Sequence, residues 1–321
     1  MTKTITDKID AVTLIPTERQ CLKPACPKSV KIELTARCNF KCQFCATSQK
    51  LRKQGEMDRD FYCRAVREMR EAGVEELGMF FLGESFLVKW LPEAIEYAKK
   101  DCGYPYVFIT SNGALSTPEK VKACMDAGLD SLKWSYNYAD EEQFEKISNV
   151  PRKNFHAMIN NIKAAHKIRE EGKYDCGLFA SSIRYNGEQL VQMEKAVEDI
   201  LPYVDEHYWL PLYSQSGLTK EAMEEIGATP VVGNFGRYGS PGTTHLCFAL
   251  FCESRITYDG KMSMCCFNHN HEFDAGDMNT TSFMDCWWSS KYQTLRKAML
   301  SGDLTGTACE NCYSYDISGY S

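Results

Sequence analysis

The feature that most constrains the fold of this chain is a regular alternation of short apolar runs with longer stretches of helical apolar spacing. The apolar runs cover residues 29–34, 77–82, 106–110, 131–135, 177–183 and 207–210. Helical spacing fills the intervals at residues 58–72, 90–100, 117–127, 154–171 and 188–200. Strands and helices that alternate about six times predict an α/β domain of parallel strands joined by crossover helices.

Composition changes on either side of this alternating region and divides the 321 residues into four parts. Residues 1–28 are polar and contain three prolines, which favours an irregular N-terminal arm. Residues 29–213 carry the alternation. Residues 214–246 are rich in Gly, Pro and Thr and are expected to form a linker or active-site cover. Residues 247–321 concentrate cysteine and aromatic residues, which predicts a second, smaller domain.

Charge and hydropathy exclude several classes of protein. The net charge of −6 argues against a nucleic-acid binder, which needs a basic face. No apolar run approaches the roughly 20 residues that cross a bilayer, and the N-terminus lacks the pattern of a secretory signal. These observations predict a cytoplasmic protein with no membrane partner. In that reducing compartment, 16 cysteines point to metal binding or catalysis rather than to disulfides.

Three cysteines, Cys38, Cys42 and Cys45, fall within eight residues just after the first predicted strand. Thiolates are the ligands of iron–sulfur clusters, and three of them leave one iron of a [4Fe–4S] cluster open to a small molecule. Structural zinc normally takes four closed ligands. A zinc site or chance clustering is the alternative interpretation at this point.

The spacing C-x3-C-x2-C, with the aromatic Phe44 just before the third cysteine, resembles the signature of the radical SAM enzymes. The resemblance implies a partial (β/α)6 barrel similar to a TIM barrel. It also implies that S-adenosylmethionine (SAM) chelates the open iron of a [4Fe–4S] cluster. One electron, supplied by a flavodoxin- or ferredoxin-type donor, then cleaves SAM and yields a 5′-deoxyadenosyl radical.

Polar residues at successive strand ends resemble the SAM contacts of that family, and barrels place their chemistry at this edge. Where the family has Gly-Gly-Glu, this chain has Leu82 before Gly83 and Glu84, so one glycine is missing. By resemblance Glu84 accepts a hydrogen bond from the SAM amino group. The other expected contacts are Ser111, Asn112, Ser135 and Asn137 to the ribose, and Ser182 and Arg184 to the carboxylate.

The C-terminal region contains a second set of four cysteines, Cys247, Cys265, Cys309 and Cys312. Four thiolates close a cluster completely, which suits electron transfer, but a zinc ribbon fits the same spacing. The pattern resembles the auxiliary-cluster "twitch" domain, a shorter form of the SPASM domain. The larger form continues with further cysteines, and this chain has none after Cys312. The resemblance therefore implies one auxiliary [4Fe–4S] cluster.

The expected reaction follows from the same resemblance. The leading hypothesis is epimerisation of an amino sugar or aminoglycoside, with the Cys252 thiol returning a hydrogen atom and Cys266 as the second candidate. Dehydrogenation of an amino-cyclitol or sugar, with the auxiliary cluster as electron acceptor, is the close alternative. Peptide modification is less favoured, because the arm before residue 29 is shorter than a peptide-recognition domain. A zinc-stabilised scaffold with degenerate motifs is a hypothesis from another class.

Overall fold

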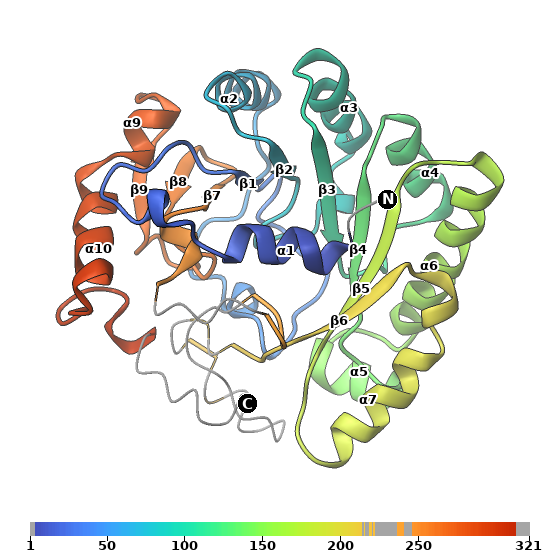
Figure 1. Ribbon diagram of the computed structural model, residues 1–321. Helices are drawn as coiled ribbons and strands as arrows, with labels where there is room; N and C mark the ends of the chain where they lie inside the picture. Colours follow the sequence, from blue (N-terminus) through green and yellow to red (C-terminus); the bar gives the residue numbers. More distant parts are fainter. Residues whose placement is uncertain are drawn as a thin grey trace.

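A single curved sheet organises the protein (Figure 1). The computed structural model describes residues 4–213, 215, 218–219, 221, 236–240 and 246–312. Within these residues, nine strands run in the order β6-β5-β4-β3-β2-β1-β7-β8-β9. The strands are β1 (Ser29–Ile32), β2 (Glu76–Gly78), β3 (Tyr106–Ser111), β4 (Ser131–Ser135), β5 (Gly177–Ile183), β6 (Glu206–Leu210), β7 (Glu253–Ile256), β8 (Lys261–Ser263) and β9 (Asp274–Asp277).

Strands β1 to β6 are parallel, and each pairs with its sequence neighbour. The sheet does not close on itself, because β6 and β9 form its two edges. Helices connect the strands on the outside, as the alternation predicts. They are α2 (Arg59–Glu71), α3 (Leu91–Glu96), α4 (Pro118–Asp126), α5 (Glu141–Ser148), α6 (Lys153–Gly172) and α7 (Glu188–Glu198). The expectation of a partial barrel is confirmed.

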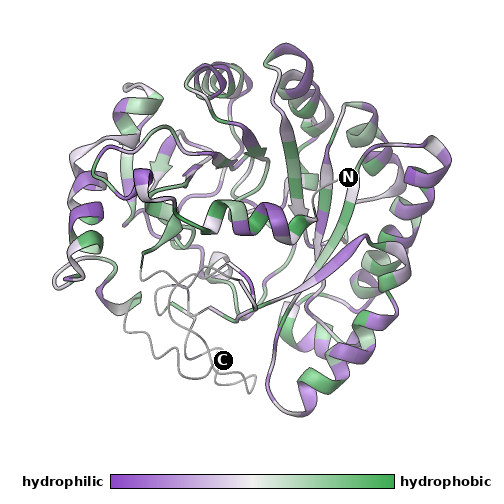
Figure 2. Ribbon diagram, viewed as in Figure 1, coloured by the Kyte–Doolittle hydropathy of each residue, from purple (hydrophilic) through white to green (hydrophobic). Residues whose placement is uncertain are grey.

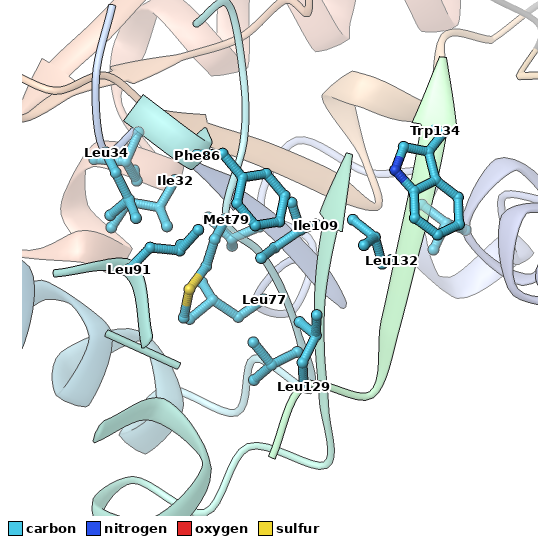
Figure 3. Packing of buried hydrophobic residues seen from close by; sticks show 14 of the residues in the cluster. Ile32, Leu34, Leu77, Met79, Phe86, Leu91, Ile109, Leu129, Leu132 and Trp134 are labelled. Carbon is cyan, nitrogen blue, oxygen red and sulfur yellow. The ribbon is translucent and has the colours of Figure 1, made fainter. Parts of the chain in front are cut away.

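Alternation along the strands sends one set of side chains outward to the helices and the other into the barrel. Ile109 and Leu132 face the helices and are fully buried, and Figure 3 shows them with Leu77 in the outer core. Their neighbours Phe108 and Lys133 line the interior. Each large outer side chain contributes roughly 1.5–3 kcal/mol by leaving water. Figure 2 shows the matching division on the helices, whose ribbons alternate between hydrophobic green and hydrophilic purple.

The C-terminal region extends the sheet instead of forming a detached unit. Strand β7 pairs in parallel with β1, and β8 and β9 follow in antiparallel pairing. Helices α9 (Phe283–Trp287) and α10 (Ser290–Ser301) cover this end of the molecule (Figure 1). The two cysteine-rich regions therefore belong to one continuous sheet.

The expectation of an irregular arm over residues 1–28 is wrong for its first part. Helix α1 (Ile5–Thr13) begins at a capping box in which Thr4 and Asp7 bond each other's backbone. It crosses the concave side of the sheet (Figure 1), where Ile5 packs against Phe179 and Tyr208. The sequence signal for this helix is Thr-x-x-Asp followed by an apolar repeat. The overall polarity of residues 1–28 hides that signal.

Candidate active site

Cys38, Cys42 and Cys45 lie in the loop that follows β1, at the carboxyl edge of the parallel strands. Burial raises the pKa of all three thiols, that of Cys38 to about 12. Cys45 raises the pKa of the other two further, so the three sulfur atoms interact across a short distance. A buried thiolate needs a compensating positive charge, and cluster iron provides one. The donor set and its burial fit an iron–sulfur cluster.

Two elements hold this loop in place. The end of α5 accepts two of its backbone N–H groups, Lys41 N to Ser148 O at 3.0 Å and Gln43 N to Ile147 O at 2.9 Å. The Tyr138 hydroxyl lies 3.1 Å from the Cys42 sulfur. Sequence analysis missed both supports, because α5 lies outside the repeated strand–helix pattern and a single tyrosine carries no motif.

Gln215 fastens the loop from the opposite side. Its amide nitrogen donates to Phe44 O at 2.7 Å, and its amide oxygen accepts from Ala46 N at 2.9 Å. The Phe44 ring packs 6.4 Å from the Tyr138 ring, measured between centroids. Phe44 is thus part of the loop's packing. Apart from a few described positions such as Gln215, the expected linker at 214–246 lies outside the described residues.

Glu84, expected to meet the SAM amino group, joins the strand ends next to Cys38. Its carboxylate accepts from Ser111 Oγ at 2.9 Å and from Asn112 N at 2.8 Å. Burial raises the pKa of Glu84, and these hydrogen bonds oppose the rise. Its charge in turn raises the pKa of Cys38. Three residues chosen from separate strand ends therefore meet at one place beside the cysteine loop.

Gly83 permits this arrangement because, without a side chain, its backbone can lie against the backbone of Thr35 and Arg37. A Cβ atom at this position would lie 2.0 Å from Thr35 O and 2.8 Å from Arg37 O. Arg37 O also accepts the Glu84 N–H at 2.9 Å, which ties this turn to the cysteine loop. A single glycine serves here, although the family pattern has two.

The remaining expected SAM contacts lie at the ends of β4 and β5. Asn137 Oδ1 accepts from Ile183 N at 3.0 Å, and the buried Ser182 hydroxyl donates to Tyr136 O. These bonds join the two strand ends to each other. Ser135 is half-buried, whereas Arg184 is exposed, with its guanidinium 5.3 Å from the Tyr238 ring centroid. Their contact with SAM stays a prediction.

The four C-terminal cysteines, Cys247, Cys265, Cys309 and Cys312, line one small, mostly apolar pocket together with Cys266. Burial raises the pKa of Cys247, and Cys309, Cys266 and Cys312 raise it further. Met264, Phe273 and Leu295 complete the wall. This donor set also fits an iron–sulfur cluster. In the described part of the chain, no three His, Cys, Asp or Glu side chains are arranged to hold a single metal ion.

A cavity of about 340 Å³ occupies the interior of the barrel. Helix α1 forms one wall, and residues from β1, β3, β4, β6 and β7 form the others. Cys266 lines both this cavity and the C-terminal cysteine pocket. It is the thiol through which the two spaces adjoin.

Cys252, the favoured donor from sequence, occupies a different place. It precedes β7 at the amino edge of the sheet, where its carbonyl accepts from Lys28 N at 3.0 Å. It is 2% exposed, and it is not among the residues that line the cavity. Five residues of sequence separation from Cys247 suggested a shared loop, and the helical turn Phe248–Leu250 lies between the two cysteines. The role of Cys252 as hydrogen donor stays a prediction.

Comparison with known families agrees with this geometry. Residues 32–178 match the radical SAM superfamily, and residues 247–313 match the iron–sulfur cluster-binding domain named SPASM. The chain combines a radical SAM domain with a SPASM domain. The radical SAM match implies SAM and a [4Fe–4S] cluster, and the SPASM match implies auxiliary iron–sulfur binding.

Curated relatives match only part of this radical SAM protein. The PqqA peptide cyclase of Granulibacter bethesdensis is 31% identical over 147 residues, which cover 46% of this chain. The same segment spans 37% of the cyclase, well under half of its length.

Two solved structures resemble the chain over most of its length. BtrN in complex with AdoMet and 2-DOIA has a TM-score of 0.59 at 15% identity, covering 89% of this chain and 92% of BtrN. Streptococcus suis SuiB bound to precursor peptide SuiA has a TM-score of 0.64 at 14% identity, covering 85% of this chain and 67% of SuiB. At these identities the likeness shows the radical SAM fold alone.

No helix in the described ranges is both long and apolar enough to span a bilayer. This finding is consistent with the composition.

Proposed function

We propose that the protein is a radical SAM enzyme that abstracts a hydrogen atom from a small molecule held inside the barrel. Cys38, Cys42 and Cys45 would hold the SAM-binding [4Fe–4S] cluster, and Cys247, Cys265, Cys309 and Cys312 the auxiliary one. When bound and reduced, the first cluster supplies the electron that splits SAM into methionine and a 5′-deoxyadenosyl radical. A flavodoxin- or ferredoxin-type protein is the proposed source of that electron.

The chain's own residues orient SAM. The Glu84 carboxylate lies beside Cys38, where it suits an ammonium donor and is held in place by Ser111 and Asn112. Ser135, Asn137, Ser182 and Arg184 extend this polar rim along the next two strand ends. The rim and the cysteine loop follow the carboxyl ends of the strands whose residues line the cavity, and in this proposal a substrate carbon inside the barrel would face the adenosyl group.

Epimerisation with Cys266 as hydrogen donor is the reaction that the geometry supports best. The observation that carries it is the position of Cys266 in the walls of both the substrate cavity and the auxiliary cysteine pocket. A substrate carbon loses a hydrogen atom to the adenosyl radical and regains one from the Cys266 S–H on its other face. The Cys266 thiyl would be returned to the thiol by one proton and one electron from the flavodoxin- or ferredoxin-type donor, and a cluster held by Cys247, Cys265, Cys309 and Cys312 would supply the path for that electron.

Dehydrogenation is the second candidate, and the same adjacency favours it. A substrate radical beside Cys266, which lines both spaces, would lose its electron to the auxiliary site and a proton to solvent or a base. BtrN, which aligns over 92% of its length, is bound to the small molecule 2-DOIA. A sugar or cyclitol, as expected from the sequence, is the proposed substrate class. Peptide modification ranks third, supported by the PqqA cyclase and peptide-bound SuiB matches.

The test uses anaerobic enzyme reconstituted with iron and sulfide, reduced, and incubated with SAM and a panel of sugars and cyclitols in heavy water. An epimerase forms 5′-deoxyadenosine and places one deuterium on the product, and Cys266→Ser blocks that incorporation while 5′-deoxyadenosine still forms. Cys252→Ser serves as the matched control and keeps the incorporation. An oxidised product without deuterium identifies the dehydrogenase instead. Wild-type enzyme that makes no 5′-deoxyadenosine defeats the proposal.

A further inference from the structure

The barrel cavity carries more positive than negative side chains, the reverse of the whole chain. Among the described residues, four cationic side chains and two carboxylates line it: Lys8, Lys31, Lys133 and Arg255, with Glu76 and Glu253. The overall charge of −6 therefore belongs to the outer surface and says little about the substrate. An aminated substrate would meet cations here.

Both carboxylates already have cationic partners. Glu253 forms ion pairs with Lys31 on β1 and with Arg255 two residues along its own strand. Glu76 lies 3.9 Å from Lys28 Nζ, and Lys8 also lowers its pKa. Neither carboxylate remains to neutralise another cation.

Lys133 is the cation without an anionic partner. It lies in the middle of β4, and its ammonium donates to Ser181 Oγ at 3.0 Å. Its Nζ also lies 5.9 Å from the Tyr208 ring centroid. Among the residues that the structure describes, no carboxylate lies within ion-pair distance of this ammonium. Lys99 offers the contrast, since on the outside of the barrel it pairs with Asp130 at 2.8 Å.

Such a placement costs stability unless a ligand offsets it. An ammonium taken out of water without an opposite charge is strongly disfavoured. Burial accordingly lowers the pKa of Lys133 to about 8. An anion entering the cavity would restore the charge balance at the Lys133 ammonium, which Ser181 Oγ holds in place by accepting one hydrogen bond.

We propose that the substrate carries an anionic oxygen group, a carboxylate or a phosphate, and that Lys133 binds it inside the barrel. This inference rests on the proposed function and narrows its substrate class from sugars and cyclitols in general to acidic or phosphorylated ones. Ser135 follows Lys133 by two residues on the same strand, one pleat and about 7 Å closer to the carboxyl edge. The anionic end thus lies deep, and the remainder of the substrate points toward the SAM rim.

The experiment measures anion binding to the anaerobic holoenzyme with both clusters, using inorganic phosphate and acetate as probes in calorimetric titrations. Wild type and Lys133→Arg bind at least one probe, and Lys133→Gln weakens that binding by about tenfold or more, the usual size of a charged hydrogen bond. Lys195→Gln, on the exposed outer side of α7, is the matched control and retains wild-type affinity. Preference for phosphate or for acetate separates the two sources of the anion.

Equal affinity of wild type and Lys133→Gln for both probes would overturn the inference, as would the absence of any binding to wild type. SAM affinity provides a further check. If Lys133→Gln weakens SAM binding as much as anion binding, the ammonium serves the SAM carboxylate, and the substrate assignment is wrong. Wild type that binds the probe through Lys133 but never forms 5′-deoxyadenosine defeats the proposed function and leaves the anion site standing.

Discussion

The two cysteine regions differ in what surrounds their sulfur atoms. Cys38, Cys42 and Cys45 stand beside the carboxylate of Glu84 and the amide of Asn112, next to an open edge of the barrel. The C-terminal set is closed in by Met264, Phe273, Leu295 and Met299. One region offers polar partners to a ligand, and the other offers an apolar enclosure.

Both cysteine sets offer thiolate ligands on one continuous sheet, but their surroundings suit different roles. A polar surround admits a charged molecule such as SAM to an iron atom that lacks a protein ligand. An apolar surround excludes water, which favours electron transfer over ligand exchange. Cys266 stands at the boundary, in the wall of both the enclosed pocket and the substrate cavity.

Replacing Cys42 by serine should have the largest effect and tests whether the first region alone cleaves SAM. We expect 5′-deoxyadenosine formation to fall to background and iron content to drop by about four atoms per chain. Cys309→Ser should lose a similar amount of iron yet still split SAM, because its site holds no SAM. Iron analysis, visible absorption and chromatography of 5′-deoxyadenosine check both variants.

Cys63→Ser, at a half-buried thiol on α2, is the control and should keep full iron and activity. If Cys309→Ser abolished SAM cleavage as completely as Cys42→Ser does, the division of labour between the two regions would fail.

An intermediate effect is expected for Glu84→Gln, which removes the charge of the polar surround with little change of shape. The loss of a charge-assisted hydrogen bond to the SAM ammonium costs about 2 kcal/mol, so the KM for SAM should rise by roughly 30-fold. The pKa of Cys38, which Glu84 raises, should fall. Steady-state assays against SAM measure the first effect, and alkylation rates of cluster-free protein measure the second.

Glu93→Gln, on the outer helix α3, is the matched control and should leave the KM unchanged. If the Glu84→Gln enzyme kept the wild-type KM for SAM, the Glu84 carboxylate would only connect the ends of β2 and β3 and would not bind SAM.

The smallest effect concerns His269, which links the two regions. Its Nδ1 lies 3.4 Å from Thr47 Oγ1 in the first cysteine loop, and burial, aided by Arg52, lowers its pKa to about 4. The folded protein therefore resists a proton that the unfolded chain accepts near pH 6.5. Stability should be complete above that pH and fall as the pH drops toward 4, by about 1 kcal/mol at pH 5.5.

Urea unfolding of the anaerobic protein at pH 7.5 and 5.5 checks this expectation. His269→Gln, which has no proton to gain, should lose less stability between the two pH values than wild type. His156→Gln, at an exposed position on α6, should behave like wild type. Equal acid sensitivity of His269→Gln and wild type would count against the buried contact.

Much of the barrel could be predicted because its signals are local. The spacing of apolar residues differs between strands and helices, so their alternation can be followed along the chain. Connections long enough to contain a helix then predict parallel strands joined by crossovers. The meeting of Glu84, Ser111 and Asn112 was predictable for the same reason, since parallel strands end at one edge. Helix α1 was missed, because its apolar residues pack against β5 and β6, some two hundred positions away.

The sequence could not predict where the two candidate donor thiols lie in the structure. Cys252 and Cys266 are each near a predicted ligand, and spacing cannot tell which one faces the interior. Cys252 follows a short helical turn and lies at the amino edge of the sheet, while Cys266 follows β8 into the cavity wall. The cationic side chains of the cavity could not be predicted for a similar reason. Net charge is a sum over the whole chain and does not say where each charge lies.

By itself the sequence determined the order of the elements, the two cysteine sets and the polar strand ends, because each depends on residues close together in the chain. Tertiary structure alone decided which thiol borders both spaces, and that Lys133 lines the cavity with no carboxylate of the described residues in ion-pair distance. Those properties depend on distances between strands, and a distance between strands is fixed only when the sheet curves and its side chains find their neighbours.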